Sequence, residues 1–146
     1  VLTKILDLGA LLRRAVLLVQ REVAERVTAR PGTRQYGYLT IQVNLSAIPE
    51  ILFSVPPSAF WPPPKVHSAV VRLTPRPQRE LWVPQDRAAF LEFVGQCFRH
   101  KRKTLRNNLV GIYGAAVERW PEAGLRAEQL SIDQFINLYQ RVAGGL

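Results

Sequence analysis

The sequence has no methionine, a single cysteine (Cys97) and only two histidines (His67 and His100). One cysteine cannot form a disulfide within the chain or a multi-cysteine zinc site, so we expect neither a disulfide nor a metal. No apolar run approaches the roughly 18–20 residues of a membrane-spanning helix, so no membrane partner is expected. There is no glycine-rich phosphate loop and no acid–histidine–nucleophile pattern. The residues by themselves therefore predict no self-sufficient active site.

Acidic residues are also scarce. Asp and Glu number 11 against 20 Lys and Arg, which gives a formal net charge of +9 and a pI near 10.6. Such an excess on a small chain favours a polyanionic partner, most often nucleic acid, over a merely solvated basic surface. The hydrophobic fraction of 47% is that of a folded protein. The low cysteine content fits a reducing, cytoplasmic setting, and a start at Val1 without any methionine leads us to expect a portion of a longer protein.

The first part of the chain predicts an α/β arrangement. Leucines at helical spacing indicate a helix over residues 1–14, and the apolar run Ala15–Val19 is typical of a strand buried on both faces of a parallel sheet. Residues 21–29 and 38–45 favour helices. The β-branched segments 48–55 and 66–73 predict two strands, which a short stiff link joins as an antiparallel pair.

The second part predicts a small helical domain. A proline- and arginine-containing linker over residues 74–79 places the boundary near residue 80, so the domains are 1–79 and 80–146. Asp86 is a candidate N-cap. Ser131 and Gln134 form a capping box at the start of the last helix, and Gly144-Gly145 ends it.

The strongest functional signal is a cluster of basic residues from Arg99 to Arg106. If the segment is one helix, four of these side chains share a face that would grip phosphates, and Asn107 and Asn108 could bond sugars or base edges. Lys101 would then fall on the apolar side, unless the helix breaks near His100. The predicted RNA-binding residues here are Arg99, Lys101, Arg102, Lys103, Arg106 and Asn107.

A second signal is the segment 56–65, in which five of the ten residues are proline. Proline fixes φ and lacks the amide donor, so this segment must be a rigid connector. It carries Phe60 and Trp61, which could stack on a base or could simply fill the core, and Lys65, which could meet a phosphate or lie on the surface.

The motifs of this sequence resemble the later part of the ribosomal RNA small-subunit adenine dimethyltransferases. The resemblance covers nearly the whole chain. The stretch around Phe60 and Lys65 is shared with the wider group of RNA adenine N6-methyltransferases, and the last two stretches favour the small-subunit enzymes. The motifs are Gln20-Arg-Glu-Val-Ala-Glu-Arg26, Tyr36-Gly37, Val55-Pro-Pro-Ser-Ala-Phe60, Pro62-Pro-Pro-Lys-Val66, Ser68-Ala-Val-Val-Arg72, Lys101-Arg-Lys-Thr-Leu-Arg-Asn107 and Arg126-Ala-Glu-Gln-Leu-Ser131.

The resemblance implies the C-terminal half of a Rossmann-like methyltransferase sheet followed by a small all-helical domain. It implies transfer of methyl groups from S-adenosylmethionine to two adjacent adenosines of small-subunit ribosomal RNA. Phe60 matches the family's adenine-stacking aromatic, and Lys65 matches the lysine of the same motif. The other catalytic residues and the cofactor-binding motifs would precede Val1, so we expect this chain alone to be inactive.

The expected partners are small-subunit ribosomal RNA or an assembly intermediate of that subunit. Removing the earlier strands would expose an edge of the strand at Ala15–Val19, so the missing half or a second copy is a further expected partner. A non-catalytic RNA-binding or ribosome-assembly module of the same shape is the alternative function. A large-subunit resistance methyltransferase is a weaker alternative, which the stretch Arg126–Ser131 disfavours.

Overall fold

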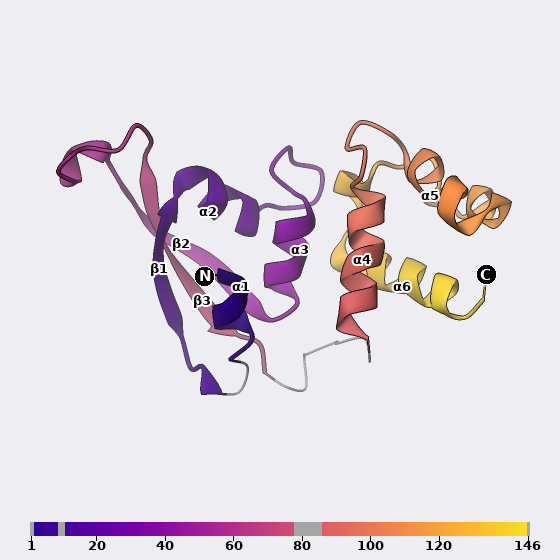
Figure 1. Cartoon of the computed structure of the whole chain (residues 1–146), viewed down its shortest axis with the longest axis horizontal. Coiled ribbons are helices and arrows are strands. Elements are labelled where there is room, and N and C mark those ends of the chain that lie inside the picture. Colours follow the sequence, from indigo (N-terminus) through magenta and orange to yellow (C-terminus); the bar gives the residue numbers. More distant parts are fainter. Residues whose placement is uncertain (1, 9–10, 78–85, 146) are drawn as a thin grey trace. The chain divides into compact units, whose positions relative to one another are not determined.

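The computed structural model describes residues 2–8, 11–77 and 86–145, which form two compact units (Figure 1). The first unit carries a β-sheet and comprises the chain up to Ala29 and again from Leu39. The second unit combines the segment Arg30–Tyr38 with the C-terminal helices. The domain boundary predicted near residue 80 lies outside the described residues and stays a prediction. Within the described residues, no helix is long and apolar enough to cross a membrane.

The first unit is built on a three-stranded sheet with the order β1-β3-β2. Strand β1 spans Ala15–Gln20, β2 spans Ala47–Val55 and β3 spans Ser68–Pro75. Both neighbours of β3 run antiparallel to it, so the predicted antiparallel pair of the last two strands is confirmed. The expectation of parallel pairing for β1 is wrong within this chain. Its short apolar run suits either direction, and the partner that the chain itself offers is β3.

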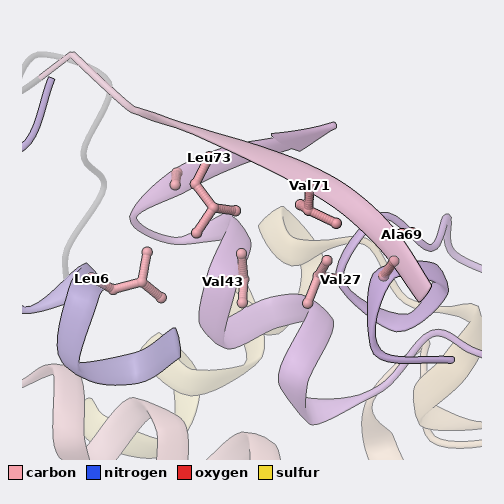
Figure 2. Close-up of a cluster of buried hydrophobic side chains, with 8 residues drawn as sticks. Leu6, Val27, Val43, Ala69, Val71 and Leu73 are labelled. Atoms are coloured by element: carbon pink, nitrogen blue, oxygen red, sulfur yellow. The ribbon is translucent and has the colours of Figure 1, made fainter. Parts of the chain in front are cut away.

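Three helices cover one face of the sheet. They are α1 (Leu2–Leu6), α2 (Arg21–Val27) and α3 (Tyr38–Asn44). Figure 2 shows the side chains from these helices directed toward β3, where Ala69, Val71 and Leu73 alternate inward, and all of them are buried. Hydrogen bonds join the two longer helices, because the Asn44 amide of α3 donates to the Val27 carbonyl oxygen of α2 at 3.0 Å. This apolar layer holds the first unit together.

Within the first unit, no described helix lies over the opposite face of the sheet (Figure 1). Leu18 pairs across the sheet with Val70, and Val70 pairs with Phe53, so the three side chains form one row on this face. Leu18 is 52% exposed and Phe53 is 57% exposed. The prediction that the first strand is buried on both faces is therefore wrong for this chain, because its residues alternate between half-buried and exposed.

The second unit is a bundle of three α-helices with short 3-10 turns. Helix α4 spans Arg87–Cys97, α5 spans Leu105–Tyr113 and α6 spans Ile132–Ala143, and the turns are η4 (Ala115–Arg119) and η5 (Ala127–Gln129). Aromatic rings fill its core, with Phe90 and Phe93 of α4 both packed against Tyr139 of α6.

Helix caps in the second unit follow the sequence. The Asp86 side chain accepts from the Ala89 amide at 3.0 Å, and Ser131 and Gln134 form the predicted capping box. These caps satisfy amides that the first helical turn leaves without partners.

Two predicted helices differ from the observed ones. The helix predicted over residues 1–14 extends in the structure only from Leu2 to Leu6, and part of its range lies outside the described residues. The continuous basic helix through Arg99 and Arg106 is also wrong, since α4 ends at Cys97 and α5 begins at Leu105. The break that the position of Lys101 had suggested is the observed arrangement.

Candidate nucleic-acid interface

The basic residues gather on the loop between α4 and α5, here called the basic loop (residues 98–104). A new helix starts after it because Thr104 is an N-cap whose hydroxyl accepts from the Asn107 amide at 3.4 Å. The amides of Leu105 and Arg106 donate instead to carbonyl oxygens of Leu125 and Ala123, at 2.8 and 3.0 Å. The loop therefore leaves one helix and enters the next with its backbone held in place.

The buried side chain of Asn108 fixes the shape of the basic loop. Its amide group donates to the carbonyl oxygens of Cys97 at 3.0 Å and His100 at 3.2 Å, and its oxygen accepts from the His100 amide at 3.2 Å. Asn108 is only 6% exposed, so it cannot bond a sugar or a base as predicted. The predicted RNA-binding residue Asn107, by contrast, has an exposed side chain.

The cations on and beside the basic loop are exposed. Within the described part of the chain, no carboxylate forms an ion pair with Arg99, Arg102 or Lys103. Arg106 differs, because its guanidinium lies 3.3 Å from the Glu118 carboxylate. The loop therefore presents a positive potential that is offset only at Arg106, which is the condition for attracting phosphates.

A second loop, residues 30–37, lies against the basic loop. The Lys101 ammonium donates to the Arg34 carbonyl oxygen, and the Gly32 amide donates to the Glu128 carbonyl oxygen at 2.6 Å. This arrangement places the exposed side chains of Arg30 and Arg34 in the same unit as the basic loop. These two arginines were not among the residues predicted from the sequence. The signal that could have found them is two arginines on either side of a Pro-Gly turn in a basic chain.

The Tyr36 ring anchors that second loop in the core of the helical unit. Its centroid lies 6.4 Å from that of Phe98, and its hydroxyl is buried without a hydrogen-bond partner. Burial raises the pKa of Tyr36 to about 12. The residue therefore serves packing rather than proton transfer.

The remaining predicted site residues lie on the proline-rich loop between β2 and β3 (residues 56–67), which projects from one end of the sheet in Figure 1. A 3-10 turn at Pro57–Ala59 shapes its first half. Phe60 is half-buried, while Trp61 and Lys65 are exposed. A shallow cavity of about 370 Å³ opens where this loop returns to the sheet. Its lining residues are Gln20, Arg21, Glu22, Glu25, Lys65, Val66 and His67.

The predicted residues thus fall into two groups, one on each unit. Phe60 and Lys65 share the proline-rich loop, and the six others lie on or next to the basic loop. Among the described residues, no group of three His, Cys, Asp or Glu side chains is placed to hold a metal. Cys97 is buried, and desolvation raises the pKa of its thiol, so it is a core residue and not a nucleophile.

Solved structures share this fold. A dimethyladenosine transferase from Plasmodium falciparum superposes with a TM-score of 0.80 over 97% of this chain and 61% of that one, at 24% identity. The 23S rRNA methyltransferase ErmE superposes with a TM-score of 0.63 over 90% of this chain and 55% of that one, at 23% identity. The chain therefore has the fold of the later part of these two proteins, a Rossmann-like sheet followed by a helical unit, and the predicted fold class is confirmed.

Sequence comparisons define the family more closely. The family model of ribosomal RNA adenine dimethylase matches residues 1–144, so the chain belongs to this family. Ribosomal RNA small subunit methyltransferase A of Chromobacterium violaceum is 46% identical over 83% of this chain and 47% of its own length. The protein of the same name from Caldanaerobacter subterraneus is 43% identical over 94% of this chain and 53% of its own length. The chain thus spans about half the length of the curated relatives it matches, and the predicted family is confirmed.

Proposed function

We propose that this chain is the RNA-gripping part of an S-adenosylmethionine-dependent enzyme that dimethylates the N6 atoms of two adjacent adenosines in small-subunit ribosomal RNA. The observation that carries the proposal is the basic loop, held rigid by Asn108 and carrying exposed cations without carboxylate partners. Family membership supplies the reaction class. The substrate is ribosomal RNA within the small subunit or one of its assembly intermediates, and the place of action is the cytoplasm.

The strand-to-helix junction that the structure describes does not fit the methyl donor. The described junction of a strand with an α-helix, at Gln20 and Arg21, has no glycine where a nucleotide-binding turn needs one. No step of methyl transfer is therefore assigned to this chain's residues. Their part is to bind and orient the RNA, with Phe60 stacking on the target adenine and Lys65 contacting a phosphate.

The phosphate contacts are assigned to the basic loop and its neighbours. Arg99, Lys101, Arg102, Lys103 and Arg106 each supply a charge, and Asn107 supplies a neutral donor. A pre-ordered loop loses little conformational entropy on binding, which favours affinity. Arg106 contributes less than Arg102 or Lys103, because Glu118 already pairs with it.

The salt dependence of RNA binding tests this assignment. The probe is a hairpin with the sequence of the 3′ end of small-subunit ribosomal RNA, and the variant replaces Arg102, Lys103 and Arg106 with Ala. Three lost phosphate contacts reduce the slope of log K against log salt by about 2–3. The matched control removes three exposed arginines elsewhere, Arg13, Arg14 and Arg119, and keeps the slope. Equal slopes in the two triple variants would show that the basic loop does not contact the RNA.

The reaction is tested in the full-length protein. Replacing Phe60 with Ala lowers the rate of methyl transfer to small-subunit RNA, whereas Phe60→Tyr keeps a stacking ring and most of the rate. A full-length protein that binds the RNA but transfers no methyl group from S-adenosylmethionine would favour a non-catalytic role in ribosome assembly.

The face of the sheet that carries Leu18, Val70 and Phe53 favours a further partner. Val16, Leu18 and Phe53 are each more than half exposed there, and the β1 edge away from β3 has no partner among the described strands. We infer that the remainder of a longer methyltransferase covers this face, because the relatives are about twice as long as the chain. Light scattering of the chain, alone and with that remainder, tests the inference. A chain that stays monomeric alone and does not bind the added remainder would contradict the inference.

A further inference from the structure

Trp61 is exposed to an unusual degree. Its side chain is 94% exposed, whereas Trp120 in the helical unit is 8% exposed. Burial of an indole lowers the free energy of the folded protein, and a large aromatic side chain normally buries most of its area in the fold. Trp61 contributes almost nothing to the core of its own unit, so its position is not explained by folding.

The loop that carries Trp61 is stiff. Five of the residues at positions 56–65 are proline, and the Ala59 and Phe60 amides donate to the carbonyl oxygens of Pro56 and Pro57 at 3.1 Å each. The loop is also closed at its base, where Val55 of β2 pairs with Ser68 of β3. The backbone that carries the Trp61 ring is held in place before any ligand arrives, which lowers the entropic cost of binding.

The backbone at Phe60 separates the two neighbouring rings. Phe60 has φ −118° and ψ 152°, which is extended backbone, and successive side chains of an extended chain point to opposite sides. Phe60 is half-buried whereas Trp61 is exposed, so the two rings differ in their surroundings. We therefore assign Trp61 a ligand separate from that of Phe60.

The charges around the loop favour an anionic ligand. The segment 56–67 contains no acidic residue, and Lys65 lies on it with an exposed side chain. Two carboxylates line the cavity at its base, but Glu25 pairs with Arg21 at 3.0 Å and Glu22 pairs with Arg26 at 2.6 Å. An exposed aromatic on the same loop as a cation that forms no ion pair within the described ranges matches the stacking and phosphate-contacting surfaces of single-strand nucleic-acid binders.

We propose that Trp61 stacks on an unpaired nucleobase of the RNA, distinct from the base assigned to Phe60, and that Lys65 contacts the phosphate next to it. This proposal rests on the proposed function, because it places a second unpaired nucleotide of the same RNA substrate on the proline-rich loop. Stacking tolerates any base, so the ligand is defined as an unpaired nucleotide flanking the modified one.

The test measures RNA affinity for two variants of the full-length protein. Trp61→Ala weakens the affinity about 5- to 150-fold, the range expected for one lost stacking contact, while Trp61→Phe stays near the wild-type value. Leu11→Ala is the control for loss of a large exposed side chain elsewhere in the chain, because Leu11 is 88% exposed. The unfolding temperature without RNA is expected to be the same for Trp61→Ala and the wild type, because the exposed Trp61 side chain contributes almost nothing to the folded core.

A set of abasic RNAs identifies the stacked nucleotide. Each unpaired position of the hairpin in turn carries an abasic sugar, and the affinities are combined with those of Trp61→Ala in a double-mutant cycle. One position at which the substitution has no further effect supports the proposal. Three results overturn it: unchanged affinity in Trp61→Ala, an equal loss at every abasic position, or a lower unfolding temperature of Trp61→Ala without RNA. If the wild-type protein binds none of the RNAs, the proposed function itself fails.

Discussion

Replacing Asn108 with Leu is expected to destabilise the helical unit and to disorder the basic loop. The Asn108 side chain makes three hydrogen bonds, two as donor and one as acceptor, and it is 6% exposed. Leucine has a similar volume but no polar atoms. The substitution therefore leaves the His100 amide and the carbonyl oxygens of His100 and Cys97 without this partner.

The magnitude follows from those three bonds. A net contribution of about 1 kcal/mol for each hydrogen bond gives a loss of about 3 kcal/mol in the free energy of unfolding. That is a large share of the stability of an ordinary domain. Because the substitution changes no charge, any accompanying loss of RNA affinity measures the ordering of the loop rather than its electrostatics.

Urea denaturation followed by circular dichroism measures the change. Asn107→Leu is the matched control, since it makes the same replacement one residue earlier at an exposed position, where a change within about 0.5 kcal/mol is expected. RNA binding at low salt is compared between Asn108→Leu and the wild type under conditions where both are folded. Equal unfolding midpoints for the two variants would refute the role given to Asn108.

Two further substitutions test the packing of the helical unit. Tyr36→Phe removes a buried hydroxyl that has no hydrogen-bond partner, so at neutral pH the free energy of unfolding stays the same or rises. Since the pKa of Tyr36 is about 12 in the folded chain and near 10 when unfolded, the wild type loses stability as pH rises from about 10 to 12. Tyr36→Phe loses less over that range, and denaturation at pH 9 and pH 11 checks the difference; parallel losses would contradict it. Ser131→Ala removes the cap of α6 and lowers the free energy of unfolding by about 1 kcal/mol, whereas Ser131→Asp keeps most of it, as thermal unfolding will show.

Features encoded by neighbouring residues were predictable from the sequence. The capping box of Ser131 and Gln134, the Asp86 cap and the antiparallel strands around the proline-rich loop all depend on short-range patterns, and the structure has each of them. The basic character of the 99–106 segment was equally visible, because charge does not depend on the fold.

The shape of the basic segment could not be predicted from periodicity. Its apolar spacing continues across the loop and imitates one long helix, but Asn108 reaches back eight residues to the His100 backbone and stabilises a break. The contact between Lys101 and Arg34 joins residues 67 positions apart, so the arginines of the second loop were hidden in the same way. Parallel pairing of β1 was expected because continuous apolar runs are typical of parallel sheets. The pattern of one strand does not determine which strand pairs with it, and in the structure β1 pairs antiparallel with β3.

The one-sided sheet of the first unit has a consequence for handling the chain. If its lowest free energy is reached only when another surface covers Leu18 and Phe53, then association and folding are linked by mass action. The melting temperature of the chain would then rise with the concentration of the remainder of the protein that covers this face. A melting temperature quoted without that concentration would have no fixed meaning.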